Sequence, residues 1–235
     1  MKILAVDSSS VSASVAILDG SKVLSDFYVN AGLTHSQTLA PMIDLAVKSS
    51  GLKISDIDFF ASTTGPGSFT GLRIGIATVK GMALGSGKKC MGVSSLLAAA
   101  YNCKNFEGLI GACMDARRSE IYGAIFRASG GKITRITQDM AISIQNFKEE
   151  IEKYKSKAIL VGDGAEMCYN NMLDGKNSEK IELSSEFSRF VSAKNVALAA
   201  IENYSEEKLL SPGELTPEYL RLSQAQRMLL EKNNL

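Results

Sequence analysis

One order of strands and helices runs twice along this chain, and that order restricts the possible folds more than any single motif. Between Ile3 and Ala100 the pattern of apolar, polar and turn residues predicts three strands, then helix, strand, helix, strand and helix. From Gly108, three further strand-like segments are followed by helix–strand units that end near Tyr204. The two halves share negligible sequence identity, so the repeat lies in the order of elements alone. This order predicts an α/β protein with two lobes, each a sheet flanked by helices.

The turn residues agree with an antiparallel start to each half. Asp19-Gly20 lies between segments 12–18 and 22–29, in which small polar and apolar side chains alternate. An Asp-Gly pair between strands is a strong hairpin signal, because a type I′ turn needs positive φ at both central residues. Ser129-Gly130-Gly131 likewise predicts a turn into a strand at 132–137.

Two long helices are expected in the first half, and the first of them carries an apolar face. The first is expected to start at Thr34 or Ser36 and to end before Gly51. Pro41 lies inside this pattern and should bend the helix or mark its true start. The second helix is expected over 72–84 and has small residues at intervals along it.

Composition limits the possible functions. The 235 residues carry a net charge of +1, so no global basic field is available to hold nucleic acid by neutralising phosphates. Contact with RNA would therefore be made through a partner. No run of about 18 apolar residues predicts a membrane span, and the first residues read as a strand rather than as a signal peptide. The four cysteines lack metal-ligand spacing, and a cytoplasmic protein with reduced thiols is expected.

The sharpest motif is the loop 65–71, with the sequence GPGSFTG, between a predicted strand and a predicted helix. Its three glycines and its proline set up a tight turn with exposed backbone N–H groups. Such a loop suits an anion or a partner at a helix N-terminus, and it suits a purely structural turn equally well. It is not a Walker A loop, because no Gly-Lys-Ser/Thr closes it.

Residues 65–75, GPGSFTGLRIG, closely resemble the signature of the TsaB family, formerly called YeaZ. This run is highly specific, whereas the other similar segments are individually weak. Those segments are 4–9 (LAVDSS), 35–42 (HSQTLAPM), 93–96 (VSSL), 115–117 (DAR) and 217–221 (PEYLR). The resemblance spans most of the chain and is densest over about the first 120 residues.

The resemblance implies a fold. It is the actin-like, ribonuclease H-like fold, in which each lobe is a mixed five-stranded sheet flanked by helices. The N-terminal lobe is then expected over residues 1–105 and the C-terminal lobe over 106–211. A C-terminal helix within 212–235 is expected to pack back on the N-terminal lobe.

The resemblance also implies a function. Proteins of the TsaB family pair with a paralogue, TsaD, which transfers threonylcarbamoyl to an adenosine beside the anticodon of tRNA. A TsaE-type ATPase joins the pair, so this chain would meet tRNA indirectly, through the complex. The expected role is that of a non-catalytic scaffold or activator subunit.

Catalysis by this chain itself is not expected. TsaD-type proteins bind a metal through two histidines four residues apart, just after a Gly-Val strand end. Gly92-Val93 is present here, but the equivalent positions are Ser95 and Ala99, and His35 is the sole histidine. One histidine cannot build a two-histidine metal site, and no GxSxG elbow supports a serine hydrolase. We therefore expect no catalytic residues, no metal and no proteolytic activity.

Nucleotide binding by the isolated chain is expected to be weak or absent, for ATP and ADP alike, and no cofactor is predicted. Kinases of the actin-like fold use an Asp-x-Gly turn after the first strand, whereas the corresponding turns here, 7–10 and 115–119, lack glycine. Residues 162–164, Gly-Asp-Gly, resemble the place where such folds hold adenosine, although a helix-start turn explains them as well. The residues of a residual nucleotide or anion site would be Asp7, Ser9, Gly65, Gly67, Gly162 and Gly164.

A helical surface of the N-terminal lobe is the expected partner site. Small residues along its second helix would let another backbone approach closely, although packing inside the lobe would use them equally well. We expect one surface to serve both a self-dimer and the TsaD-type heterodimer, so that the two compete. In the simpler interpretation, His35 caps or packs at a helix start. The candidate interface residues are His35, Gln37, Leu39, Met42, Ile43, Phe69, Leu72, Arg73, Gly75, Ile76 and Val79.

Two other classes of function stay open. An ATP-dependent small-molecule kinase or phosphotransferase of the same fold would show that activity in the pure chain, although the missing glycine turns disfavour it. A stand-alone RNA-binding module is disfavoured by the near-zero net charge. The basic clusters Arg117-Arg118 and 153–157 fit a solvated surface, or a minor contact with tRNA within the complex.

Overall fold

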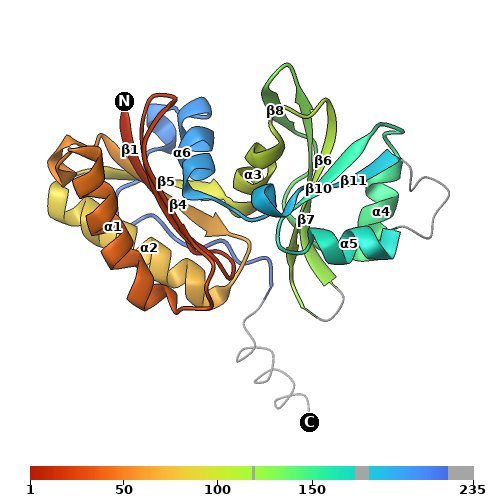
Figure 1. The fold of residues 1–235 in the computed structure, drawn as a ribbon, viewed down its shortest axis with the longest axis horizontal. Coiled ribbons are helices and arrows are strands. Elements are labelled where there is room, and N and C mark those ends of the chain that lie inside the picture. Colours follow the sequence, from red (N-terminus) through yellow and green to blue (C-terminus); the bar gives the residue numbers. More distant parts are fainter. Residues whose placement is uncertain (118–119, 173–179, 222–235) are drawn as a thin grey trace, which may run out of the picture.

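The computed structural model describes residues 1–117, 120–172 and 180–221. Two mixed β-sheets lie beside each other, with helices α3 (Ser95–Ala100) and α6 (Ala193–Glu202) between them (Figure 1). Further helices cover the outer face of each sheet. The architecture therefore has the two lobes that the repeated order of elements predicts.

The first sheet has the strand order β3-β2-β1-β4-β5. Strand β1 pairs antiparallel with β2 and parallel with β4, so hairpin strands lie on one side of it and crossover strands on the other. Gly20 turns the first hairpin with a φ of 57°, the positive value that the Asp-Gly pair predicts. The strands are β1 (Lys2–Asp7), β2 (Ala13–Asp19), β3 (Lys22–Val29), β4 (Phe59–Gly65) and β5 (Lys89–Ser94).

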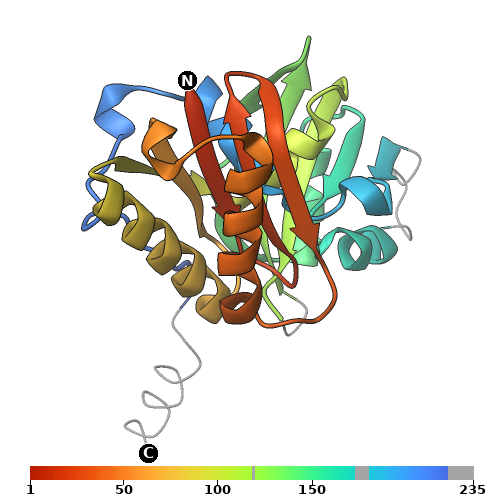
Figure 2. The ribbon, with the colours of Figure 1, turned by 60° about the vertical axis from the view of Figure 1, so that its left-hand side comes forward.

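Helices α1 (His35–Ser50) and α2 (Phe69–Ser86) lie side by side on the outer face of the first sheet (Figure 2). Ser68 caps α2, because its hydroxyl accepts a hydrogen bond from the Gly71 amide at 3.2 Å. Pro41 lies inside α1, well after the first turn, so it does not mark the start of the helix.

The second sheet has six strands, so the expectation of five strands in each lobe is wrong for it. Five strands follow the order β11-β10-β6-β7-β8, and β9 pairs with the first half of β7. Since β7 has ten residues, two short strands pair with it one after the other. The sequence did not reveal β9, because its residues Met-Ala-Ile-Ser show no strict alternation of apolar and polar side chains. The strands are β6 (Gly108–Asp115), β7 (Glu120–Ser129), β8 (Lys132–Arg135), β9 (Met140–Ser143), β10 (Ala158–Val161) and β11 (Ile181–Leu183).

Helices α4 (Ile144–Glu152) and α5 (Ala165–Met172) cover the outer face of the second sheet. Alternate side chains of β6 serve two different cores: Leu109 and Cys113 face α4 and α5, while Ile110 faces the layer of α3 and α6. Within the described ranges, none of the helices combines the length and the apolar character that crossing a bilayer requires.

Helix α6 lies inside the range 106–211 expected for the C-terminal lobe, yet it packs on β1 and β2 of the first sheet. Small side chains such as Ala193, Ala197 and Ala200 are fully buried there and allow a close approach. One apolar core therefore runs through both lobes, and the division expected at residue 105 does not separate the helix layers.

The C-terminal segment runs along the first lobe up to Arg221. Cys90 and Leu210 exchange two backbone hydrogen bonds of 2.8 Å, and Leu215 is completely buried. The backbone N–H of Glu218 donates to the Thr64 carbonyl at 2.7 Å. This described part is not helical, and residues 222–235 of the expected helix lie outside the described residues.

Replacing Phe60 by alanine should lower the free energy of unfolding by about 3–5 kcal/mol, because its ring is completely buried in the core of the first lobe. Phe187→Ala is the matched control, since the Phe187 ring is fully exposed and its loss should change stability by less than about 0.5 kcal/mol. Urea denaturation followed by circular dichroism measures both variants. Equal losses would contradict this packing.

Candidate functional site

The carboxyl end of β1 brings a buried carboxylate to the boundary between the lobes. Asp7 is fully buried, and its Oδ1 accepts hydrogen bonds from the Thr63 hydroxyl at 2.8 Å and from the Ser9 amide at 3.1 Å. Its Oδ2 has no partner among the described residues. Burial raises the pKa of Asp7, an effect that those hydrogen bonds partly oppose.

The glycines of the loop 65–71 make room for the protein's own backbone. Gly65 has a φ of 130°, and a Cβ there would collide with the Glu218 carbonyl oxygen. Gly67 has a φ of 157°, and a Cβ there would collide with the Ser9 carbonyl oxygen. The Ser68 amide donates to the same Ser9 carbonyl at 2.7 Å. Of the two interpretations that the sequence left open, the structural turn is the one that these contacts support.

The same turn after β1 also explains two small residues of α2. A Cβ on Gly71 would collide with the Ser8 carbonyl oxygen, and one on Gly75 with the Ser8 hydroxyl. The Ser8 hydroxyl in turn donates to the Gly71 carbonyl at 2.9 Å. These glycines therefore let α2 pack on the turn inside the lobe and do not receive a partner's backbone.

In the second lobe, the turn after β10 packs against the end of β6. Gly162 has a φ of 110°, and a Cβ there would collide with the Cys113 carbonyl. A Cβ on Gly164 would lie 3.0 Å from the Asp115 amide nitrogen, and that amide donates to the Asp163 carboxylate at 3.1 Å. Burial raises the pKa of Asp163 to about 6, and the charges of Asp115 and Asp7 add to this effect.

A cleft of about 610 Å³ opens between the lobes, at the turns that follow β1 and β6. Of the six residues predicted for a residual nucleotide or anion site, Ser9 and Gly67 line it. The other four do not line it, and the three glycines among them are closed off by the chain's own carbonyl and amide groups. The lining residues are Ser9, Ser10, Val11, Gly67, Ser68, Phe69, Thr70, Met114, Asp115, Ala116, Arg117, Tyr122, Asp163 and Arg221.

His35 ties the start of α1 to the turn after β1. Its Nε2 lies 2.9 Å from the Ser10 carbonyl oxygen, so this nitrogen carries the proton and donates. Its Nδ1 is buried and has no partner among the described residues. The contact agrees with packing at a helix start. Within the described ranges, no cluster of three His, Cys, Asp or Glu side chains is arranged to hold a metal.

Seven of the eleven residues predicted for the partner interface are buried inside the first lobe, so the prediction that they form its surface is wrong. They are Leu39, Met42, Ile43, Leu72, Gly75, Ile76 and Val79. His35 and Phe69 are half-buried, and Gln37 and Arg73 are exposed. The apolar pattern of a helix reveals that one face will be covered, and here the lobe's own sheet covers it.

The sequence analysis missed the residues that α1 and α2 expose, which we call the α1–α2 face. Leu45 is 49% exposed and Leu84 is 76% exposed, although both are large and apolar. The spacing of 77, 81 and 84 along one side of α2 was a usable signal, because residues three and four apart share a helix face. The α1–α2 face consists of Ala40, Pro41, Leu45, Ala77, Gly81 and Leu84.

Two predicted interface residues contact the chain's own C-terminal segment. The rings of Phe69 and Tyr219 stack with 3.8 Å between their centroids, and Arg73 Nε donates to the Tyr219 hydroxyl at 2.8 Å. Arg221 then crosses to the second lobe, where it donates to the Ala116 carbonyl at 3.0 Å and pairs with Glu120. The segment 218–221 therefore links the two lobes at the edge of the cleft. Of the predicted basic pair, Arg117 lines the cleft, while Arg118 lies outside the described residues.

Comparison with known proteins gives matches over nearly the whole chain. The family model for tRNA N6-adenosine threonylcarbamoyltransferase, TsaD, matches residues 30–229. The tRNA threonylcarbamoyladenosine biosynthesis protein TsaB of Escherichia coli is 29% identical over 232 residues, covering 97% of this chain and 98% of the relative. TsaB of Bacillus subtilis is 25% identical over 232 residues, covering 98% of this chain and 99% of the relative. YeaZ from Pseudomonas aeruginosa superimposes with a TM-score of 0.81 at 23% identity, over 93% of this chain and 99% of that structure.

Gly71→Ala should destabilise the protein by about 1–3 kcal/mol, because the new methyl group would collide with the Ser8 carbonyl. Gly81→Ala is the matched control on the same helix. A Cβ at Gly81 meets open space, and alanine should stabilise the helix by about 0.5–1 kcal/mol. Thermal and urea unfolding measure both, and a stabilised Gly71→Ala variant would refute the proposed contact.

The half-buried Asp163 carboxyl should make stability fall as the pH rises between about 4 and 6. Its raised pKa means that the folded state binds this proton more tightly than the unfolded state does, so the associated stability is present at low pH and is lost above the folded pKa. Asp163→Asn should therefore gain stability over the wild type between pH 4 and pH 7, by up to about 3 kcal/mol. Asp44→Asn, at an exposed position on α1, is the control. If the free energy of unfolding of all three proteins changed with pH in the same way, the prediction would be contradicted.

Proposed function

Because the chain belongs to the TsaB family of tRNA threonylcarbamoyladenosine biosynthesis proteins, we propose that it is a non-catalytic subunit that binds a TsaD-type threonylcarbamoyltransferase. The observation that carries this proposal is a near full-length likeness to TsaB relatives in a chain with one histidine. That histidine is hydrogen-bonded to the turn after β1. Ser95 and Ala99, where the metal-binding histidines would stand, are buried in α3 and provide no imidazole.

The α1–α2 face is the surface that we assign to this partner. It combines two exposed leucines with the small residues Ala40, Ala77 and Gly81, so the backbone of a facing helix can approach closely while apolar area is covered. The TsaD family model matches this chain, so a TsaD-type protein presents a lobe of related fold with corresponding helices. Two such lobes can pack with α1 and α2 of each in contact, around a pseudo-two-fold axis.

A second copy of this chain can use the same face. A two-fold self-dimer then buries the leucines of both copies, and it competes with the heterodimer for one surface. The balance between the two assemblies depends on the concentrations of the two proteins.

We assign the contacts with tRNA to the complex rather than to this chain alone, because a net charge of +1 gives little attraction for phosphates. A TsaE-type ATPase would join the pair of subunits and supply nucleotide hydrolysis to it. In this scheme the chain's contribution to threonylcarbamoyl transfer is to bind and activate its catalytic paralogue.

The double variant Ala77→Arg/Leu84→Arg should abolish both the self-dimer and the heterodimer, because two charges would be buried without partners. Size exclusion with light scattering, on mixtures with the cognate TsaD-type protein, measures both assemblies. Transfer of threonylcarbamoyl to tRNA should be lost with the variant, and it should also be lost when the chain is omitted. Gly75→Leu is not a suitable test, because its side chain would collide with Ser8 inside the lobe.

Val23→Arg is the matched control, because Val23 is a 46% exposed apolar residue on β3. It pairs with Leu18, whose side chain belongs to the core on the sheet face opposite to α1 and α2. The control variant should leave both assemblies and the transfer activity unchanged. A stable heterodimer of the folded double variant would rule out the α1–α2 face as the binding surface.

The isolated chain should bind ATP and ADP weakly or not at all, because its own backbone occupies the space that the glycines of 65–67 and 162–164 open. Isothermal titration with ATP and magnesium, together with an assay of phosphate release, measures this. Saturable binding with steady turnover would favour the alternative function, an ATP-dependent small-molecule kinase or phosphotransferase.

A further inference from the structure

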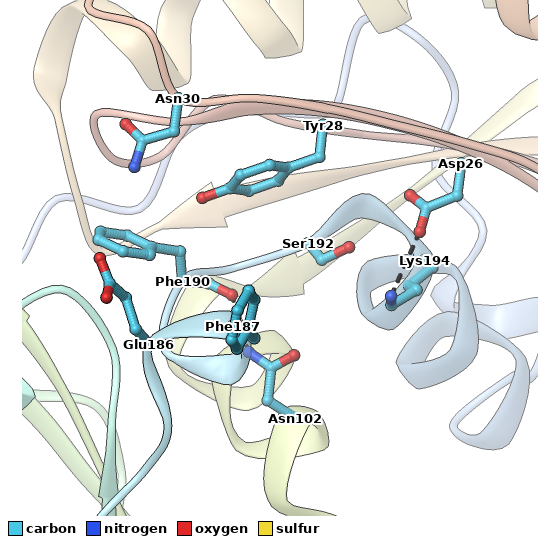
Figure 3. A pocket seen from close by; sticks show the side chains of 9 residues that line it. All are labelled: Asp26, Tyr28, Asn30, Asn102, Glu186, Phe187, Phe190, Ser192 and Lys194. Atoms are coloured by element: carbon cyan, nitrogen blue, oxygen red, sulfur yellow. Dashed lines mark hydrogen bonds and ion pairs between the residues drawn. The ribbon is translucent and has the colours of Figure 1, made fainter.

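A second cavity, of about 410 Å³, lies away from the cleft and from the α1–α2 face (Figure 3). One wall is formed by Asp26 and Tyr28 of the edge strand β3, with Asn30 just after it. The facing wall comes from residues 186–194, which precede and begin α6. Its volume falls in the range of about 300–1,000 Å³ that small-ligand sites occupy.

Three aromatic rings surround this cavity. Figure 3 shows Tyr28 across the space from Phe190, with Phe187 on the side of Asn102. Phe187 is fully exposed and Tyr28 is 45% exposed, so apolar ring area faces water. Exposed aromatic rings that border a cavity are a common mark of a binding site, because an occupant would cover them.

The backbone that carries Phe190 is held firmly in place. The Asn102 side chain donates to the Phe190 carbonyl at 2.7 Å and accepts from the Asn195 side chain. The Phe190 ring therefore stands on a supported wall, and the facing wall is a strand of the first sheet. Such a site is largely formed before a ligand arrives.

The charges around the cavity do not balance. Asp26 and Lys194 form an ion pair with 3.3 Å between Oδ2 and Nζ, so these two charges offset each other. The Glu186 carboxylate, next to Phe190 in Figure 3, forms no ion pair or side-chain hydrogen bond with any described residue. The aromatic cavity thus carries one uncompensated negative charge.

We propose that this cavity binds an organic cation, an alkylammonium or guanidinium group, between Tyr28 and Phe190 with Glu186 as its counter-ion. The faces of aromatic rings attract cations through the ring quadrupole, and an adjacent carboxylate adds a charge-assisted hydrogen bond. An anion would meet Glu186 unfavourably, because Lys194 is already paired. A neutral apolar ligand would bury the carboxylate without a partner. The cation can be a free amine or the side chain of a lysine or arginine on another protein.

The test is an NMR titration of the full-length chain with methylguanidinium, spermidine and a capped Gly-Arg-Gly peptide, with acetamide as the neutral probe. The cations should shift the amide signals of residues 26–30 and 186–194 in a saturable way, with dissociation constants in the millimolar range or below. Acetamide should not shift them. Raising the salt concentration should weaken the binding of the cations.

Glu186→Gln should weaken cation binding at least fivefold, and Phe187→Ala should weaken it as well. Both side chains are exposed, so the fold should be retained. Glu207→Gln is the control, because it removes the same charge at an exposed position outside the cavity and should leave binding unchanged.

The probes also separate the two sources of the cation. Tighter binding of the peptide than of methylguanidinium, by tenfold or more, assigns the site to a side chain of a partner protein. Binding of spermidine at least as tight as that of the peptide assigns it to a free amine. No saturable shift at any probe concentration, or equal affinities for the wild type and Glu186→Gln, would overturn the proposal. The inference does not rest on the proposed function.

Discussion

The close contact between the turn after β1 and the start of α2 determines much of what this molecule can do. Backbone atoms of Ser8 and Ser9 occupy the space that Gly67 and Gly71 leave open, and the Ser68 amide donates its hydrogen bond to the Ser9 carbonyl. In a phosphate-binding loop, such glycines and amides would face a ligand. Here they hold α2 against β1 and close the wall of the cleft. The same contact directs the apolar side of α2 into its own lobe, so its small and aliphatic outer side faces solvent.

The C-terminal segment adds a second constraint on the cleft. It follows the first lobe through Leu215, stacks Tyr219 on Phe69, and reaches the second lobe through Arg221. The two lobes are thus joined at the cleft by this segment as well as by the shared core around α3 and α6. A molecule whose lobes are held together in this way can present a stable surface, as the binding role proposed above requires.

The family match and the geometry address different questions. The likeness to TsaB relatives and the two mixed sheets confirm the expected family and the actin-like, two-lobed fold. They do not identify which residues meet a partner. Burial does so in part, because it removes seven candidates from the surface and leaves the outer sides of α1 and α2 exposed. The aromatic cavity beside β3 is a separate feature, whose chemistry suits a cation rather than a phosphate.

The sequence by itself determined the order of elements apart from β9, the Asp-Gly hairpin, and the lack of a histidine pair. These follow from local rules, because turns, caps and residue identity depend on near neighbours in the chain. It also identified the apolar face of α1 and the small residues of α2, but not what would cover them. Only the tertiary structure decided that Leu39 and Val79 face the sheet while Leu45 and Leu84 face solvent, and that α6 packs on the first sheet. It alone placed Tyr28 across a cavity from Phe190 and packed Ser9 against Gly67, because these arrangements join segments whose separation in sequence leaves no local signal.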